Sequence, residues 1–151
     1  MDKKLNMTDF NGQDEAILEI LAKDCKITTR EIAKKTGIPH STVHKKIKQM
    51  ESEGIITGYR ATIDYKKIGK GTRALVLAGT TPRADYTAMM KEILKHKEVE
   101  EIAAVSGDFD IAIMVRTTDV DQLDKFVFEN LRRVEGMTNT HTMIIFRYWK
   151  A

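Results

Sequence analysis

Hydrophobic residues in the N-terminal third of the chain recur at helical spacing and predict a bundle of three helices. The first helix follows Asn11, whose side chain can cap it, and its apolar face consists of Ala16, Ile17, Ile20 and Leu21. The second helix is short. It begins after Thr28, which has capping-box spacing to Glu31, and it ends at Gly37, because glycine accepts the positive φ of a helix C-terminus.

The third predicted helix runs from about His40 to Ser52, and its inward side consists of Val43, Ile47 and Met50. Its opposite side is polar at i, i+3, i+4 and i+7, and we call this set the polar stripe: Ser41, His44, Lys45 and Lys48. A short capped helix, a tight turn and a helix with an exposed polar side are typical of a helix-turn-helix, whose second helix enters the major groove of DNA.

The candidate DNA-binding residues follow from the chemistry of DNA. Hydroxyl and imidazole groups can hydrogen-bond to base edges, and lysines can contact guanine or phosphate. Helix N-termini can also bind phosphate. The candidates are therefore the polar stripe and three residues near the helix starts: Thr29, His40 and Thr42.

The charge distribution supports double-stranded DNA as a partner, although other partners stay open. No acidic residue lies between Glu31 and Glu51, whereas this segment contains Lys34, Lys35, Lys45, Lys46 and Lys48. A solvated lysine-rich helix face or a three-helix protein-binding module would give a similar pattern. The tight turn and the short second helix favour DNA.

Catalytic and metal-binding residues are not evident. His40 and His44 are spaced for one face of a helix, but no third metal ligand lies nearby in the sequence. Cys25 is the only cysteine, so an internal disulfide is excluded, and we expect this side chain to pack at the end of the first helix. Asp108 and Asp110 lack an acid–base companion. We expect neither an enzyme nor a bound metal or cofactor.

The pattern changes at Ile55. The segment Ile56–Asp64 is β-like, and Lys66–Gly71 is typical of a linker. We predict a helix-turn-helix domain over residues 8–56, a linker strand and hinge over 57–71, and a second domain over 72–151.

The second half alternates between strand and helix patterns. The predicted strands are Thr72–Thr80, Val99–Val105, Phe109–Thr117 and Met137–Trp149, and the predicted helices are Ala84–His96 and Asp119–Arg133. A tight hairpin is expected at Ser106–Asp108. The order βαββαβ is that of a ferredoxin-like domain, so the fold class is α+β. Such a sheet leaves one face open, and apolar residues near its end (Ile144 or Ile145, Phe146 and Trp149) predict a homodimer through this face.

Composition describes an ordinary globular protein. Of the 151 residues, 42% are hydrophobic and 31% are charged, and the net charge of +3 does not by itself indicate nucleic acid. No apolar run approaches the roughly 20 residues of a membrane span. The segment Met1–Asn6 has no apolar region behind its lysines, so a signal peptide is not expected. These features predict a cytoplasmic protein without a membrane partner.

Several motifs resemble one family of regulators. The segments Gln13–Leu18, Thr29–Ala33, Gly37–Val43 and Glu53–Ile56 resemble the DNA-binding domain of the Lrp/AsnC (feast/famine) transcriptional regulators. Ser106–Asp110 resembles the Gly-Asp-aromatic-Asp hairpin of that family, and Gly136–Thr142 resembles its Thr-x-Thr final strand. Three residues depart from the family pattern. Pro39 replaces a serine-type cap of the third helix, Phe109 stands where the family often has tyrosine or tryptophan, and Glu135 stands where a proline often precedes the glycine.

The resemblance implies an assembly and an effector. It implies dimers in which linker strands Ile56–Ile63 pair between subunits, further assembly such as octamers, and a RAM-type ferredoxin-like domain that binds a small effector, typically an amino acid. The implied effector-binding residues are Ser106, Gly107, Asp108, Asp110, Thr140 and Thr142. Backbone N–H groups at Gly107 would suit a carboxylate, and Asp108 or Asp110 an ammonium group.

Simpler interpretations of these features remain open. Gly107 and Asp108 would form a hairpin turn without any ligand, and the threonines are ordinary strand formers. A chromatin-type protein that coats DNA without sequence preference, or an enzyme built on the ferredoxin-like domain, are the alternatives to a sequence-specific regulator.

Overall fold

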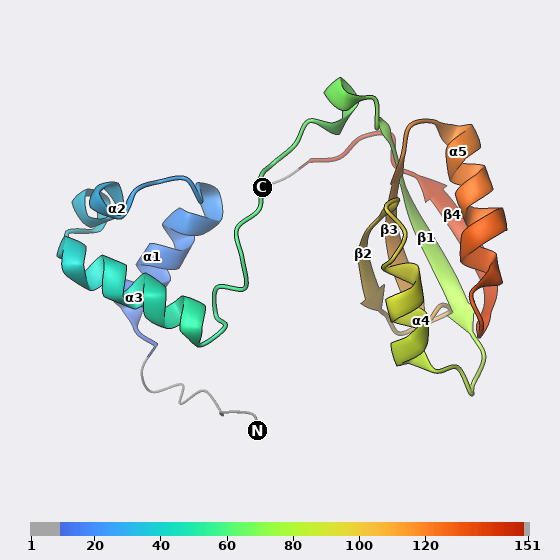
Figure 1. The fold of residues 1–151 in the computed structure, drawn as a ribbon, viewed down its shortest axis with the longest axis horizontal. Helices are drawn as coiled ribbons and strands as arrows, with labels where there is room; N and C mark the ends of the chain where they lie inside the picture. Colours follow the sequence, from blue (N-terminus) through green and yellow to red (C-terminus); the bar gives the residue numbers. More distant parts are fainter. Residues whose placement is uncertain (1–9, 150–151) are drawn as a thin grey trace. The chain divides into compact units, whose positions relative to one another are not determined.

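The computed structural model describes residues 10–149, which separate into two compact units with the boundary between Thr62 and Ile63. The N-terminal unit contains the three predicted helices, α1 (Gly12–Lys23), α2 (Thr29–Thr36) and α3 (His40–Ser52) (Figure 1). No strand occurs within residues 10–62. The predicted domain limits at residues 8 and 151, and the segment Met1–Asn6, lie outside the described residues.

The core of the N-terminal unit is formed by the predicted apolar faces. Ile17 of α1, Ile32 of α2 and Val43 of α3 are fully buried, and Ile38, Ile47 and Met50 complete the cluster. We had expected Cys25 to pack at the end of the first helix, because free cysteines are usually buried, but this expectation is wrong. Cys25 is exposed, because it lies beyond the last turn of α1.

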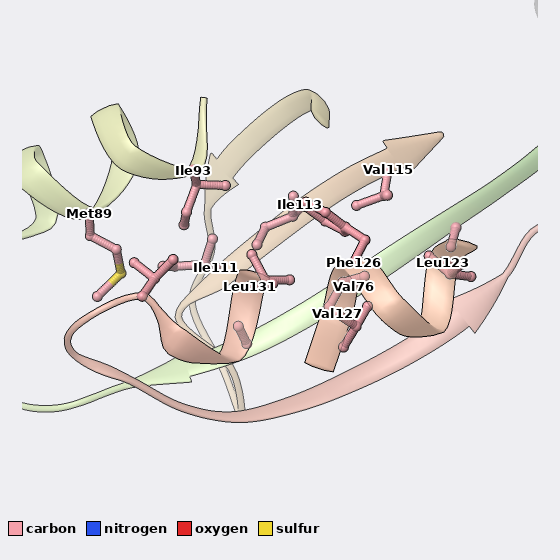
Figure 2. Packing of buried hydrophobic residues seen from close by; sticks show 13 residues of the cluster. Val76, Met89, Ile93, Ile111, Ile113, Val115, Leu123, Phe126, Val127 and Leu131 are labelled. Atoms are coloured by element: carbon pink, nitrogen blue, oxygen red, sulfur yellow. The ribbon is translucent and has the colours of Figure 1, made fainter. Parts of the chain in front are cut away.

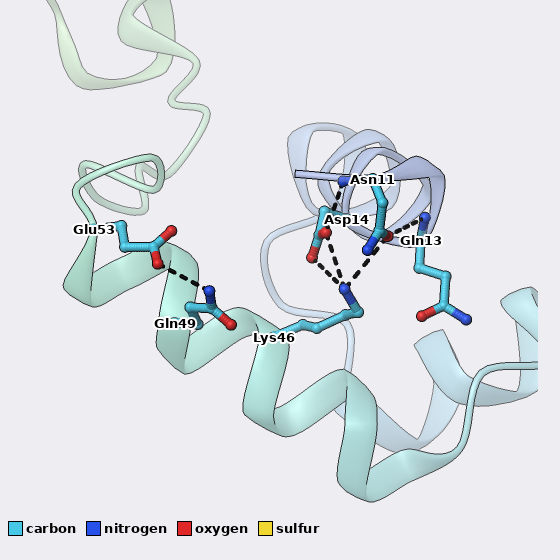
Figure 3. Close-up of polar contacts among 6 residues, drawn as sticks. All are labelled: Asn11, Gln13, Asp14, Lys46, Gln49 and Glu53. Atoms are coloured by element: carbon cyan, nitrogen blue, oxygen red, sulfur yellow. Dashed lines mark hydrogen bonds and ion pairs between the residues drawn. The ribbon is translucent and has the colours of Figure 1, made fainter. Parts of the chain in front are cut away.

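A buried ion pair connects α1 to α3 (Figure 3). Lys46 Nζ lies 2.9 Å from both carboxylate oxygens of Asp14, and the two side chains are only 16% and 8% exposed. Asp14 also accepts the backbone N–H of Asn11 at 3.0 Å and so completes the capping box of α1. Counting Lys46 among the lysines that favour DNA is therefore wrong, because its ammonium group is bound to Asp14 within the fold.

The predicted linker strand has no pairing partner within the described part of the single chain. Residues 57–64 form no strand in the described chain, and a 3-10 helix, η1 (Tyr65–Ile68), occupies part of the segment predicted as an irregular linker. The physical reason is that a strand needs a hydrogen-bonded neighbour, and no other described segment of this chain pairs with residues 57–64.

The C-terminal unit has the predicted βαββαβ order. Its elements are β1 (Thr72–Thr80), α4 (Tyr86–Ile93), β2 (Val99–Ala104), β3 (Ile111–Thr117), α5 (Val120–Lys125) and β4 (Met137–Ile144). A π-helical turn (Phe126–Asn130) and a 3-10 turn (Leu131–Arg133) prolong α5. The antiparallel sheet has the strand order β2-β3-β1-β4, which is ferredoxin-like.

The helices cover one face of this sheet. Figure 2 shows Met89 and Ile93 of α4 packing with the side chains of alternate strand residues such as Ile111 and Ile113. The continuation of α5 adds the buried Phe126 and its neighbours Val127 and Leu131 to the same cluster. Val115 of β3 and Leu123 of α5 also belong to the buried cluster, whereas Phe109, which precedes β3, is outside it.

Several boundaries in this unit differ from the prediction; for example, β3 begins at Ile111 rather than Phe109. Helix α4 is shorter than the predicted Ala84–His96, and Tyr86 and Leu94 at its two ends are 42% and 58% exposed. Strand β4 ends at Ile144 rather than Trp149: Ile144 is the last residue paired with β1, opposite Ala74, and one further hydrogen bond runs from the N–H of Ile145 to the carbonyl of Arg73. Phe146 and Trp149 consequently lie beyond the strand and are 87% and 78% exposed.

The predicted tight hairpin between β2 and β3 is a longer connection, Val105–Asp110. The backbone N–H of Val105 donates to the carbonyl of Asp110, but the N–H of Asp110 donates to Ala78 of β1. The carboxylate of Asp110 also accepts hydrogen bonds from the backbone N–H and the hydroxyl of Thr80, at 2.7 and 2.9 Å. These bonds anchor Asp110 to β1 and lengthen the turn.

The buried ion pair gives a stability prediction. Asp14→Ala should lower the free energy of unfolding of the N-terminal unit by about 3 kcal/mol, because it leaves the largely buried Lys46 ammonium without a carboxylate partner, only the Asn11 amide oxygen remaining at 3.4 Å. Amide hydrogen exchange of Val43 and Ile47 in the full chain measures this change. The exposed neighbour substitution Glu15→Ala is the control and should change it by less than about 0.5 kcal/mol. Equal effects of the two substitutions would contradict the structural role of the pair.

Candidate DNA-binding and effector sites

Local hydrogen bonds define where α2 begins and ends, and α3 follows after a short turn. At the start of α2, the N–H of Glu31 donates to the Thr28 hydroxyl at 3.2 Å, and the Glu31 carboxylate accepts the N–H of Thr28 at 2.9 Å. This backbone hydrogen bond lowers the pKa of Glu31. At the end of α2, Gly37 has φ 72° and donates its N–H to Ala33. Pro39 then caps α3 without a side-chain hydrogen bond.

The polar stripe of α3 is exposed along its whole length. Ser41, His44, Lys45 and Lys48 are all solvent-accessible, whereas Val43, Ile47 and Met50 on the other side of the helix are buried. Lys45 forms no ion pair with any residue in the described part of the chain. Thr42 is half-buried, so this side chain is less accessible than the polar stripe.

Two predicted DNA-binding residues outside the polar stripe contact each other. Thr29 Oγ1 lies 2.8 Å from His40 Nε2, a hydrogen bond that joins the first turn of α2 to the first turn of α3. The pair thus holds the N-termini of the two helices together, on the side of the helix-turn-helix that approaches DNA in this motif. The sequence did not predict this contact.

The predicted effector loop carries exposed polar groups. Ser106, Gly107 and Asp108 are exposed, and Gly107 has φ 128°. Asp110 is different, because Thr80 already donates two hydrogen bonds to one of its carboxylate oxygens. Within this loop, Asp108 is therefore the more accessible carboxylate.

The predicted threonines of β4 lie on the helix-covered face of the sheet. Thr140 and Thr142 pair with the buried residues Ala78 and Val76 of β1, and directly paired residues share a face. Arg132 Nε donates to Thr140 Oγ1 at 2.8 Å, a contact that the sequence pattern did not indicate.

The loop and the threonines are not brought together on one face within a single chain. Phe109 in the loop instead lies beside His141, with ring centroids 6.1 Å apart. His141 pairs with Leu77, on the open face opposite Thr140 and Thr142. Sequence reasoning missed His141, because strand alternation alone does not reveal which face the loop approaches.

Two arginines and one glutamate form an ion-pair cluster on the open face of the sheet. Glu100 of β2 bonds to Arg73 of β1 at 2.7 Å through one oxygen and to Arg116 of β3 through the other. Arg73 also lies over the ring of Tyr148, and Arg116 over that of Tyr65, at 4.4 and 4.0 Å from the ring centroids. Burial alone would raise the pKa of Glu100, but the two arginines outweigh burial and hold this pKa below its ordinary value.

A helix-turn-helix joined to a ferredoxin-like unit defines a class of two-part DNA-binding regulators. Residues 73–151 match the family model described as the Lrp/AsnC ligand binding domain, and residues 10–57 match the one described as a winged helix-turn-helix DNA-binding domain. The chain belongs to the Lrp/AsnC family of transcriptional regulators and has a DNA-binding and a ligand-binding domain. It is a regulator of this family rather than an enzyme.

Curated relatives agree with this assignment. The chain is 32% identical over 137 residues to the HTH-type transcriptional regulator FL11 of Pyrococcus furiosus, covering 91% of this chain and 89% of that protein. It is 33% identical over 143 residues to the HTH-type transcriptional regulator LysM of Sulfurisphaera tokodaii, covering 95% and 99% of the two chains.

Solved structures have the same fold at lower sequence identity. Escherichia coli AsnC aligns with a TM-score of 0.80 and 24% identity over 92% of this chain and 93% of that one. A Neisseria meningitidis transcriptional regulator in complex with L-Met aligns with a TM-score of 0.87 and 21% identity, over 94% and 93%. A Mycobacterium tuberculosis feast or famine regulatory protein complexed with L-methionine aligns with a TM-score of 0.84 and 23% identity, over 92% of this chain and 93% of that one. Within residues 10–149, no helix is long and apolar enough to cross a membrane.

The Glu100 cluster predicts a pH dependence of stability. Because the folded-state pKa of Glu100 is lowered, its stabilising contribution is complete above the unfolded-state pKa of about 4.3 and is lost as the pH falls through the folded-state value. Glu100→Gln should therefore destabilise the protein at pH 7, and the difference from wild type should shrink as the pH is lowered toward 3.

Urea unfolding followed by circular dichroism between pH 7 and pH 3 checks this dependence. The exposed neighbour substitution Glu101→Gln is the control. A difference in stability between the wild type and the Glu100→Gln variant that stays constant over this range would contradict the lowered pKa of Glu100.

Proposed function

We propose that this chain is a cytoplasmic, sequence-specific transcriptional regulator that binds double-stranded DNA through the polar stripe of α3. The observation that carries the proposal is that adjacent lysines of α3 have different surroundings. Lys46 is held inside the fold by Asp14, while the adjacent Lys45 and the rest of the polar stripe are exposed. Helix α3 thus has one side that serves stability and one that is available to a groove of DNA.

The residue types suggest distinct roles within this surface. Ser41 and His44 can hydrogen-bond to base edges, and the flexible ammonium groups of Lys45 and Lys48 suit phosphates or guanine. Thr29 and His40, hydrogen-bonded to each other, would orient the start of α3 and offer a second phosphate contact. Thr42 is half-buried and would contact DNA only through its outer edge.

We further propose that the ligand-binding domain binds an amino acid. Backbone N–H groups around Gly107 would bind the carboxylate, and Asp108 the ammonium group. Ser106, Asp110, Thr140 and Thr142 stay candidate effector residues, although Asp110 is already bonded to Thr80. Two related folds occur in complexes with L-methionine, which supports this ligand class.

The separation of the loop from the threonines supports an oligomer. In one chain, Thr140 and Thr142 lie on the face opposite the Phe109–His141 pair, so a pocket that uses the loop and the threonines together requires more than one chain. The open face also exposes apolar side chains such as Met143, which is 39% exposed. We propose a homodimer through this face and further assembly, such as an octamer, around the effector sites.

Substitutions in the polar stripe test the DNA-binding surface. Lys45→Ala should weaken binding to all sequences and flatten the slope of log affinity against log salt by about 0.9, because one phosphate contact is lost. Ser41→Ala and His44→Ala should instead cost about 1–3 kcal/mol on specific DNA and much less on random DNA. Fluorescence anisotropy titrations at several salt concentrations measure both effects.

A footprint of the wild-type protein identifies the specific DNA for these titrations. Protected half-sites at regular spacing are expected for a regulator, and uniform protection would support a coating protein instead. Equal losses on specific and random DNA for all three variants would contradict the proposed base contacts.

A thermal-shift screen of the twenty amino acids tests the effector. Binding at a concentration a hundredfold above the dissociation constant should add about 2.7 kcal/mol of stability and raise the melting temperature. Asp108→Asn should abolish the shift, because the ammonium partner is lost, whereas the exposed Asp124→Asn on α5 should keep it. The absence of any shift at millimolar concentration would contradict an amino-acid effector.

A further inference from the structure

A short chain of hydrogen bonds links the polar stripe to the segment that follows α3. Lys48 Nζ lies 3.0 Å from one carboxylate oxygen of Glu51, and the hydroxyl of Tyr59 donates to the other oxygen at 2.9 Å. All three residues belong to the N-terminal unit. Both oxygens of Glu51 are therefore engaged, one by a candidate DNA contact and one by the segment that leads toward the second unit.

This geometry favours an ordered ion pair over a transient one. An exposed pair usually gains little, because two flexible side chains must be held in one geometry. Here Tyr59 holds the carboxylate, and the Glu51 side chain is only 30% exposed, while Lys48 remains 67% exposed. The hydrogen bonds from Lys48 and Tyr59 lower the pKa of Glu51, so this carboxylate stays ionised at neutral pH.

We propose that Glu51, positioned by Tyr59, competes with DNA phosphate for Lys48 and thereby limits the affinity of the protein for all DNA. The proposal rests on the proposed function of Lys48 as a DNA contact. A phosphate that binds Lys48 must displace Glu51 or share the ammonium group with it. Because Tyr59 holds the carboxylate in place, the conformation of the segment after α3 determines how strongly Glu51 competes.

The same helix end provides a matched control. Glu53 has the same charge and lies two residues further along, but its carboxylate accepts a hydrogen bond from Gln49 at 2.9 Å and forms no ion pair with a described residue (Figure 3). The change in DNA affinity caused by Glu53→Gln measures only the general repulsion between an acidic side chain and DNA. The change caused by Glu51→Gln measures this repulsion together with the release of Lys48.

The experiment measures binding of the full chain to a random-sequence duplex, so that no operator is needed. Glu51→Gln should tighten binding about fivefold at moderate salt and steepen the salt slope by about 0.9, because one more lysine neutralises a phosphate. Glu53→Gln should tighten binding less than about twofold and leave the slope unchanged. Tyr59→Phe should give part of the Glu51→Gln effect.

A double-mutant cycle with Lys48→Ala isolates the interaction. In the Lys48→Ala background, Glu51→Gln should have no more effect than Glu53→Gln. Equal effects of Glu51→Gln and Glu53→Gln in the wild-type background, or a full Glu51→Gln effect without Lys48, would overturn the proposal. If Lys48→Ala weakens binding but Glu51→Gln leaves it unchanged, the competition fails while the DNA contact stands. If Lys48→Ala has no effect, the proposed function of Lys48 fails as well.

Discussion

The buried contact between Asp14 and Lys46 fixes the rotation of α3 about its own axis. An ammonium group in this position cannot lose its partner without a large free-energy cost, so α3 cannot turn without breaking the pair. Because helical residues follow one another at about 100°, fixing Lys46 also fixes Lys45 on the exposed side and Ile47 on the buried side. The accessibility of the polar stripe thus follows from this interaction together with the burial of Val43, Ile47 and Met50 on the other side of the helix.

In both units, folding buries one side of the functional element and leaves its other side exposed. The N-terminal unit packs its three helices around a small core and leaves one side of α3 polar. The C-terminal unit buries one face of its sheet beneath α4 and α5 and leaves the other face exposed, with the Arg73–Glu100–Arg116 cluster near one end of the strands. In each unit the surface available to a partner is the side that folding does not use.

The elements that the sequence predicted well are those with local signals. Helix α1 begins, and α2 and α3 begin and end, as predicted, because Asn11, Thr28 and Gly37 act within a few residues of themselves. The order of strands and helices in the second unit was also predictable from hydrophobic periodicity. The errors arise from contacts between distant residues: the partner of Lys46 lies 32 positions away, and that of Asp110 lies 30 positions away. Likewise the arrangement of the effector loop beside His141 depends on the fold of the whole sheet.

The alternation along β4 has a consequence for how this sequence can change over evolution. Thr140 and His141 are neighbours in the chain but lie on opposite faces of the sheet, one beside Arg132 and the other beside Phe109. A substitution at either position changes one face only. The deletion of a single residue between Gly136 and Thr140 would exchange the two faces at once. This segment therefore tolerates variation in residue type far better than variation in length.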